Sequence, residues 1–306
     1  MNEPVLRRAR AVTLLGALAM LLASAAFAKA VLSLRASPQP AAAPEREAPR
    51  ADGARTLGGV VVPQATLARG RTVFLVHCAA CHGPAGDGTG VSGRGLVPPP
   101  RDLTLGLFKF ASVPAGELPT DADLLRTLTE GLHGTAMLPW KDLGEGDLAA
   151  VIAYVKLLSP RWVDGTPGEP IVPPADPWRE SPKEAEARGL AVYHGLARCQ
   201  SCHPAYETLA TIDAASRALT GRAAESRENA LRAVRKESEY GVSLLPPDFT
   251  RDDLRRARTR ADLYVVLAAG ITGTAMPTWQ GSLSESDLWA LVHYVDGLRE
   301  RGRAPH

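Results

Sequence analysis

The stretch Cys78-Ala79-Ala80-Cys81-His82 decides how this sequence folds, and a second stretch with the same pattern, Cys199-Gln200-Ser201-Cys202-His203, lies further along the chain. In each stretch two cysteines are three positions apart and a histidine follows directly. On one turn of helix the two thiols lie on the same side, next to the imidazole. The chain of 306 residues has four cysteines in all, so the two stretches account for every one of them.

Covalent attachment of haem is the chemistry that this pattern favours. Two thiols at this spacing can bond the two vinyl groups of one porphyrin, and the histidine that follows, His82 or His203, can ligate the iron. Two alternatives use the same residues. Zinc would need both clusters to combine into one site of four ligands. A redox disulfide of the thioredoxin type would need a βαβ setting, which the sequence does not indicate.

An internal repeat surrounds the two clusters. Residues 66–158, which we call the first repeat, and residues 185–299, the second repeat, present the same features in the same order. These features are a glycine and an aromatic residue in a first helix (Gly70, Phe74; Gly189, Tyr193), the cysteine cluster, a turn tetrapeptide (101–104; 247–250), an acidic helix start (Asp123; Asp262), the motif Gly-Thr-Ala-Met (134–137; 273–276), a tryptophan (Trp140; Trp279) and a final helix with a tyrosine (Tyr154; Tyr294). Because no alternation typical of strands persists, we predict an all-α protein with two tandem helical domains.

Two of the four methionines occupy the same place in both repeats. Met1 is the initiator and Met20 lies in an N-terminal apolar stretch, whereas Met137 and Met276 each end a Gly-Thr-Ala-Met motif. Thioether sulfur is a soft ligand that raises the reduction potential of haem iron. We therefore predict Met137 and Met276 as the second axial ligands of the two irons, with ordinary core packing as the alternative.

Each repeat resembles a class I cytochrome c domain, and the whole chain resembles the diheme c-type cytochromes of bacterial respiratory chains. The resemblance rests on the helix glycines, the two cysteine clusters, the Gly-rich run at 81–90 and the methionine motifs. It implies two covalently bound haem c groups with their irons. The residues implied as their ligands and attachment points are Cys78, Cys81, His82 and Met137, and Cys199, Cys202, His203 and Met276.

The same resemblance implies that the first and last helices of each repeat cross closely at a glycine, at Gly70 against Tyr154 and at Gly189 against Tyr294. The second repeat departs from the family pattern in two places. Pro204 follows His203 where the first repeat has its Gly-rich run, and the stretch between histidine and methionine is longer, with a charged, helix-prone segment over residues 210–239.

The N-terminus has the pattern of an export signal or a membrane anchor. Arg7, Arg8 and Arg10 precede an uncharged apolar stretch over residues 11–28. We expect a retained anchor that holds the protein on the periplasmic side of the bacterial inner membrane, and the alternative is a soluble periplasmic protein after signal cleavage. The expected organisation is a signal or anchor segment (1–36), an Ala/Pro-rich spacer (37–60), a first cytochrome c domain (61–160), a Pro-rich linker (161–184) and a second cytochrome c domain (185–302).

With both axial positions of each iron filled, we expect an electron carrier and not an enzyme. The expected partners are redox proteins: a quinol-oxidising complex, a periplasmic dehydrogenase or a terminal oxidase, with the membrane added if the anchor is retained. The net charge of +2 at pH 7 gives no reason to expect a nucleic-acid partner. Two alternatives stay open: a diheme peroxidase-like enzyme with one open haem, and a haem-bearing docking subunit of a larger redox complex.

Overall fold

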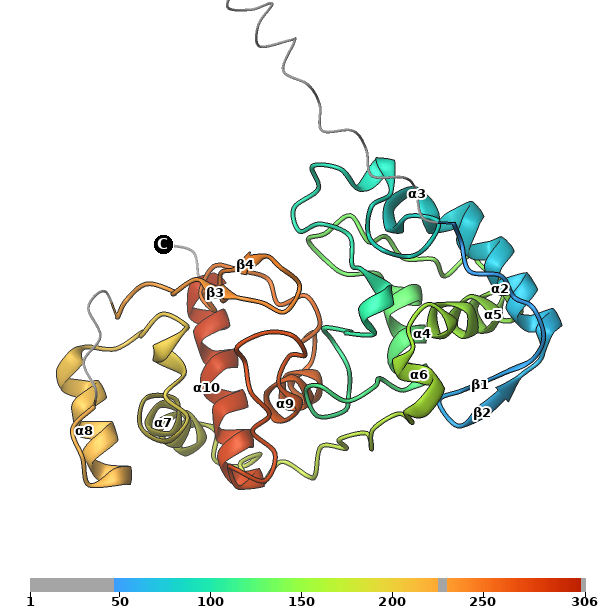
Figure 1. The fold of residues 1–306 in the computed structure, drawn as a ribbon. Coiled ribbons are helices and arrows are strands. Elements are labelled where there is room, and N and C mark those ends of the chain that lie inside the picture. The colour runs from blue at the N-terminus through green and yellow to red at the C-terminus, as the bar shows by residue number, and fades with distance from the viewer. Residues whose placement is uncertain (1–46, 225–229, 304–306) are drawn as a thin grey trace, which may run out of the picture. The chain divides into compact units, whose positions relative to one another are not determined.

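Both repeats consist mainly of helices in the computed structural model, which describes residues 47–224 and 230–303 (Figure 1). The α-helices are α2 (Gln64–His77), α3 (Ala79–His82), α4 (Asp121–Glu130), α5 (Glu145–Leu157), α6 (Arg161–Asp164), α7 (Pro182–Ala191), α8 (Leu209–Thr220), α9 (Arg260–Ala269) and α10 (Glu285–Arg303). Shorter helical turns are η1 (Val91–Gly93), η2 (Leu103–Leu105), η3 (Val192–Leu196) and η4 (Cys199–Ser201). The two antiparallel hairpins are β1 (Arg55–Leu57) with β2 (Val60–Val62), and β3 (Lys236–Glu237) with β4 (Ser243–Leu244). The predicted all-α class is confirmed.

The N-terminal segment predicted as signal or anchor, residues 1–36, lies outside the described residues, as do residues 37–46 of the predicted spacer. Within residues 47–224 and 230–303, no helix combines the length and the apolar character needed to cross a membrane. The described residues belong to one structural unit, Arg46–His306.

The first and last helices of each repeat pack against each other, α2 against α5 and α7 against α10. A methyl group added to Gly70 would overlap the carbonyl oxygen of Ala150 and crowd the Cβ of Tyr154. A methyl group on Gly189 would meet the neighbouring helix at Tyr294 in the same way. The absence of a side chain therefore allows both close crossings, as the family resemblance implied.

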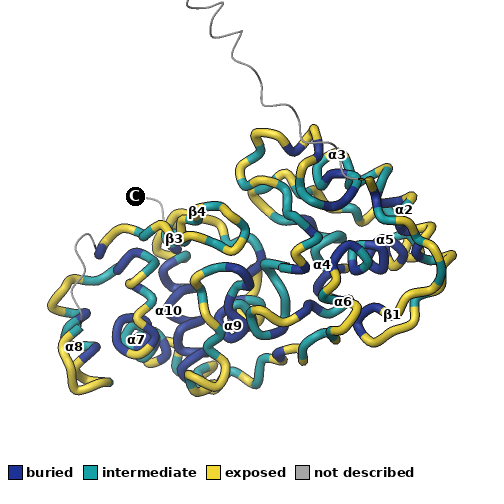
Figure 2. The backbone as a smooth tube through the Cα atoms, in the orientation of Figure 1, coloured by how far each residue is buried: buried dark blue, intermediate teal, exposed yellow. Residues whose placement is uncertain are grey.

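Aromatic pairs fill the space beside each crossing. The rings of Phe74 and Tyr154 have centroids 5.4 Å apart in the first repeat, and those of Tyr193 and Tyr294 are also 5.4 Å apart in the second. All four side chains are almost fully buried, and the final helices α5 and α10 contain long runs of buried residues (Figure 2). Pairs at this distance add to the hydrophobic stabilisation of the helix contact.

A capping box starts the third helix of each repeat. The backbone N–H of Asp123 donates to the hydroxyl of Thr120 at 3.1 Å, and that of Asp262 donates to the hydroxyl of Thr259 at 3.1 Å. Each aspartate carboxylate accepts in return from the backbone N–H of its threonine. These paired bonds satisfy N–H groups that the first turn of a helix leaves without partners, which explains the acidic residue found at both helix starts.

The ends of the predicted spacer and linker are structured. Leu57, in the predicted spacer 37–60, pairs in the β1–β2 hairpin and is fully buried in a cluster with Trp162. Trp162 lies in the short helix α6, inside the predicted linker 161–184. Neither residue lies in a stretch with a helical hydrophobic period, so hydrophobic periodicity does not detect this contact.

The last part of the predicted linker contacts the second repeat, whereas Gly168 and Ile171 donate backbone hydrogen bonds to Leu118 and Ser112 of the first. The indole N–H of Trp178 donates to the carbonyl oxygen of Ser286 at 2.9 Å, and the carboxylate of Asp176 contacts Nε2 of His293 at 2.8 Å. The charged stretch 210–239 also differs from its prediction. Helix α8 ends at Thr220 because Gly221 takes a left-handed conformation, and the described residues at the far end of the stretch enter strand β3.

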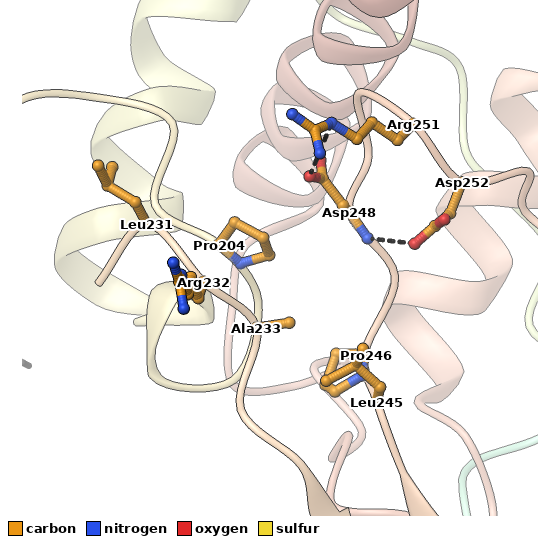
Figure 3. A pocket seen from close by; sticks show the side chains of 9 residues that line it. All are labelled: Pro204, Leu231, Arg232, Ala233, Leu245, Pro246, Asp248, Arg251 and Asp252. Atoms are coloured by element: carbon orange, nitrogen blue, oxygen red, sulfur yellow. Dashed lines mark hydrogen bonds and ion pairs between the residues drawn. The ribbon is translucent and has the colours of Figure 1, made fainter. Parts of the chain in front are cut away.

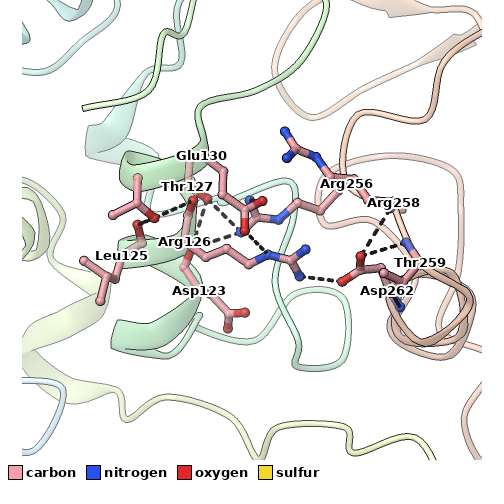
Figure 4. A network of polar contacts seen from close by, with 10 residues as sticks. Asp123, Leu125, Arg126, Thr127, Glu130, Arg256, Arg258, Thr259 and Asp262 are labelled. Carbon is pink, nitrogen blue, oxygen red and sulfur yellow. Dashed lines mark hydrogen bonds and ion pairs between the residues drawn. The ribbon is translucent and has the colours of Figure 1, made fainter. Parts of the chain in front are cut away.

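Ion pairs join the two repeats between α4 and the start of α9 with the segment before it (Figure 4). The guanidinium of Arg126 lies 2.7 Å from the carboxylate of Asp262, and Arg256 lies 3.7 Å from the carboxylate of Glu130. Arg256 is buried and also donates to the carbonyl oxygen of Asp123 at 3.4 Å. This part of the contact between the repeats is thus polar and directional.

Candidate haem sites

Each cysteine cluster forms one helical turn that starts at its first cysteine. The backbone N–H of His82 donates to the carbonyl oxygen of Cys78 at 2.9 Å, and that of His203 donates to the carbonyl oxygen of Cys199 at 2.9 Å. The turns are α3 and η4. The same hydrogen bond closes the turn in both repeats, and it places two thiols and an imidazole on one turn, as the spacing predicted.

Burial makes the first cysteine of each cluster a poor thiolate. Desolvation is the largest cause that raises the pKa of Cys78 to about 11 and that of Cys199 to about 12. Both thiols are therefore protonated at neutral pH, whereas redox-active cysteines have lowered pKa values in electropositive surroundings. This chemistry disfavours the thioredoxin-like alternative.

A backbone carbonyl orients each candidate histidine ligand. Nδ1 of His82 lies 2.9 Å from the carbonyl oxygen of Arg101, and Nδ1 of His203 lies 3.0 Å from that of Pro247. A carbonyl oxygen only accepts, so the ring proton is on Nδ1 and Nε2 carries the lone pair for iron. Burial lowers the pKa of both imidazoles, which favours the neutral form that a metal ligand requires.

The accepting carbonyls belong to the turn tetrapeptide that both repeats share. In the first repeat the backbone N–H of Thr104 donates to the carboxylate of Asp102 at 2.9 Å, and in the second repeat that of Thr250 donates to Asp248 at 3.0 Å. Each threonine hydroxyl donates to the same oxygen. The aspartate fixes the turn, and the turn fixes the carbonyl oxygen that holds the histidine.

The methionine loops have the same hydrogen bonds in both repeats. The backbone N–H of Met137 donates to the hydroxyl of Thr135 at 3.1 Å, and this hydroxyl donates to the carbonyl oxygen of Leu132 at 2.7 Å. In the second repeat the backbone N–H of Met276 donates to the hydroxyl of Thr274 at 3.2 Å. The threonine of the Gly-Thr-Ala-Met motif therefore sets the position of the methionine backbone.

One pocket of about 670 Å³ brings together all four predicted ligand and attachment residues of the first repeat: Cys78, Cys81, His82 and Met137. Its volume lies within the range of about 300–1,000 Å³ that is usual for small-molecule and cofactor sites. Phe74, Leu128 and Trp140 are among the apolar side chains that line it. Two thiols, an imidazole and a thioether around an apolar cavity form the donor set that haem c requires, so these residues fit the group.

Three cationic side chains also line this pocket: Arg101, Lys109 and Arg255. Burial, followed by repulsion from Arg255 and Arg101, lowers the pKa of Lys109 to about 8. Positive charges gathered in an apolar cavity attract anionic groups. The two propionates of a haem are anions of the right kind for this end of the pocket.

The second repeat gathers its candidate ligands against one apolar cluster. Cys199 and Met276 both pack against the core that contains Phe249. The imidazole of His203 stacks on the ring of Phe249, with centroids 4.7 Å apart and planes 19° from parallel. Cys202 is partly exposed at the end of the same turn. The donor set of the first repeat thus recurs here.

A separate pocket of about 500 Å³ lies in the second repeat (Figure 3). Pro204 and Asp248, which border the candidate histidine and its supporting turn, line it, and Asp248 contacts Arg251 at 3.9 Å across its wall. Its lining includes none of the four predicted ligand or attachment residues of the second repeat. We therefore do not assign haem to this pocket.

The arrangement of the described side chains does not support the zinc alternative. Over residues 47–224 and 230–303, no three His, Cys, Asp or Glu side chains lie close enough to hold one metal ion together. The zinc alternative would need such a cluster, whereas a haem iron takes only its axial ligands from the protein.

Sequence reasoning missed several residues around these sites. The recurrence of Thr135 and Thr274 in a shared motif was a signal that could have identified them. Arg255 and Tyr240 belong to the second repeat but line the pocket of the first, and no local pattern in a sequence reports such a contact.

The comparisons with known proteins agree with this geometry. The chain matches the cytochrome c family described as "Cytochrome C oxidase, cbb3-type, subunit III" over residues 65–155 and again over residues 184–295. Its fold is similar to a solved chain of the reducing HAO-like protein complex of Kuenenia stuttgartiensis, with a TM-score of 0.61 and 29% sequence identity over 75% of this chain and 95% of that chain. No curated protein matches the sequence.

Proposed function

Because the chain belongs to the cytochrome c family just described and is a diheme c-type cytochrome with two covalently bound haem c groups, we propose that it transfers single electrons between redox proteins. Its residues take the same roles in both repeats. The cysteine pairs 78/81 and 199/202 form the thioether bonds, His82 and His203 are the proximal ligands, and Met137 and Met276 are the distal ligands.

The observation that carries this proposal is the duplicated support of both axial ligands. Each imidazole is held through Nδ1 by a backbone carbonyl, and each methionine backbone is held by a threonine hydroxyl, with nearly equal distances in the two repeats. A site that must open for substrate would not need both ligands fixed. Two closed sites suit a carrier.

Bound haem supplies an iron that gains or loses one electron. The chain's own residues set the conditions for that exchange. The carbonyl oxygens of Arg101 and Pro247 keep the imidazoles oriented, and the apolar lining around Phe74 and Trp140 excludes water. Arg101, Lys109 and Arg255 would balance the carboxylates of the propionates. Fixed surroundings reduce the structural change that accompanies each change of charge.

A haem-bearing subunit of a larger redox complex is the second candidate function. The solved chain with a similar fold is named as part of a two-component HAO-like complex, and this name favours stable association for the present chain also. The peroxidase-like alternative receives less support, since it requires one iron without methionine and both methionine loops have the same internal bonds.

We further propose a site of action on the periplasmic side of the bacterial inner membrane, with the N-terminal segment as anchor. The support is the sequence pattern of Arg7, Arg8 and Arg10 before an apolar stretch. A quinol-oxidising complex, a periplasmic dehydrogenase or a terminal oxidase are the partners that fit a carrier in this position.

Absorption and spin-state spectra of the oxidised protein test the proposal. Two low-spin haems with a methionine-to-iron charge-transfer band are expected. Met137→Leu and Met276→Leu should each remove about half of that band and lower the reduction potential of one centre only. A high-spin ferric haem in the resting wild-type protein would contradict the carrier function and support an enzyme.

A further inference from the structure

We infer that Tyr240, a residue of the second repeat, is a positioning residue shared by both haem sites. Its ring closes the pocket of the first repeat, and its hydroxyl holds the methionine loop of the second. The inference rests on the axial ligands proposed above, and it adds a connection between the two centres that neither repeat provides by itself.

The ring of Tyr240 lies at the pocket of the first repeat. Tyr240, Val242 and Leu244 all contribute to its lining. The guanidinium carbon of Arg101 lies 3.2 Å from the centroid of the Tyr240 ring, a cation–π contact at close range. The carbonyl oxygen of the same Arg101 holds Nδ1 of His82. One residue therefore separates the tyrosine ring from the proximal ligand of the first haem.

The hydroxyl of Tyr240 reaches the other centre. It donates to the carbonyl oxygen of Thr272, and the backbone N–H of the preceding Glu239 donates to the carbonyl oxygen of Gly273 at 3.0 Å. Gly273 opens the Gly-Thr-Ala-Met motif that ends at Met276. Tyr240 and its neighbour thus attach to the start of the loop that presents the distal ligand of the second haem.

A comparison of the two loops shows that this contact is built into the second repeat. A methyl group on Gly273 would overlap the ring of Tyr240, whereas a methyl group on the equivalent Gly134 would meet no atom within 4 Å. Both glycines have a positive φ, so both are required by the loop conformation. Gly273, unlike Gly134, must also leave room for an aromatic ring.

The hairpin β3–β4 fixes the position of this tyrosine. Lys236 pairs with Leu244 and Glu237 pairs with Ser243, and Tyr240 lies in the turn between the strands. The hydroxyl of Ser238 closes the turn by donating to the carbonyl oxygen of Val242 at 2.6 Å. The hairpin belongs to the longer histidine-to-methionine stretch of the second repeat, so that added length supplies the contact between the centres.

Two substitutions separate the contributions of the ring and the hydroxyl. Tyr240→Phe keeps the ring over Arg101 and removes the bond to Thr272, so the charge-transfer band and the reduction potential of the second centre should shift while the first stays at its wild-type value. Tyr240→Leu also removes the ring, and the potential of the first centre should fall as water, which favours the ferric charge, enters the pocket.

Tyr264→Phe is the matched control, because Tyr264 is buried against Trp289, with centroids 4.9 Å apart, and does not line the first pocket. It should leave both centres unchanged. Met137→Leu and Met276→Leu proteins assign each signal to its centre, and wild-type spectra in both of these would show that the ligand proposal itself is wrong.

Wild-type potentials and bands for both centres in Tyr240→Phe and Tyr240→Leu, at unchanged haem content, would overturn the inference. A change confined to the second centre in Tyr240→Leu would overturn the closure of the first pocket. If Tyr240→Leu does not fold, Tyr240→Phe still decides the hydroxyl contact, because it retains the ring and its packing.

Discussion

The hydroxyl of Thr135 makes two hydrogen bonds that shape the first methionine loop, as an acceptor from the N–H of Met137 and as a donor to the carbonyl oxygen of Leu132. Thr274 repeats the arrangement before Met276. Valine has nearly the same shape and makes neither bond. The ligand therefore depends on a neighbour that never touches the iron, as is common around metal sites.

Thr135→Val should weaken the methionine band of the first haem and leave the second intact, and Thr274→Val should do the reverse. Each lost bond is worth about 1 kcal/mol, so the thermal unfolding midpoint should also fall. Near-infrared spectra and thermal unfolding measure both effects. Thr129→Val is the control, because Thr129 donates to the carbonyl oxygen of Leu125 within α4 and should not alter either band. A normal band for both haems in Thr135→Val would exclude the role given to this hydroxyl.

At the scale of the elements, the fold of each repeat depends on its pair of crossing helices. The helices can meet because Gly70 in the first repeat and Gly189 in the second have no side chain. Gly70→Ala should lower the free energy of unfolding by about 1–3 kcal/mol, because the added methyl has no room beside Ala150. Gly189→Ala should behave alike in the second repeat. Chemical denaturation of the haem-loaded protein gives the values.

Gly146→Ala supplies the matched control for both. Gly146 lies in helix α5 and a methyl group there would meet no atom within 4 Å. Because alanine favours helix over glycine by about 1 kcal/mol, this change should stabilise the protein slightly. Equal effects of the three substitutions would show that the crossings are not the tight contacts that the structure shows.

The helical elements were predictable because each depends on local patterns that occur twice, and the crossings followed from the family resemblance. The cysteine turns, the Gly-Thr-Ala-Met loops and the crossing glycines can all be read from short segments. Leu57, Trp162 and Tyr240 were not predictable, since each gains its place from a contact with a distant segment. The helix expected through residues 210–239 stops at Gly221, where a left-handed residue outweighs the propensity of the residues around it.

At the scale of the whole molecule, the contacts that join the two repeats include a backbone hydrogen bond, an ion pair and a cation–π contact. The backbone N–H of Ala115 donates to the carbonyl oxygen of Ala269 at 2.8 Å, Arg126 pairs with Asp262, and Tyr240 stacks on Arg101. The contact between Tyr240 and Arg101 lies next to the first haem site. The pair between Arg126 and Asp262 lies at the start of α9, the helix that precedes the second methionine loop. The relation between the repeats is therefore tied to the geometry of the two centres.

Asp262 is the charged residue of this contact for which a pH effect can be derived. Burial acts to raise its pKa, but hydrogen bonds from Arg126 and Thr259 outweigh burial, and the net pKa is lowered from 3.8. A carboxyl group whose pKa is lower in the folded state stabilises that state above its unfolded pKa. This stabilisation is lost as the pH falls through the lowered value.

Asp262→Asn keeps the capping acceptor for Thr259 and removes the charge that Arg126 contacts at 2.7 Å. Because Arg126 is partly exposed to solvent, the pair should contribute about 0.5–1 kcal/mol at pH 7. The coupling energy from a double-mutant cycle with Arg126→Gln should have that size at pH 7 and approach zero once the pH falls below the lowered folded-state pKa of Asp262, where protonation removes the charge in the wild type as well. Asp296→Asn, which breaks the 2.8 Å pair with Arg260 inside the second repeat, should leave this coupling unchanged. Strictly additive effects of Arg126→Gln and Asp262→Asn at pH 7 would mean that this ion pair does not hold the repeats together.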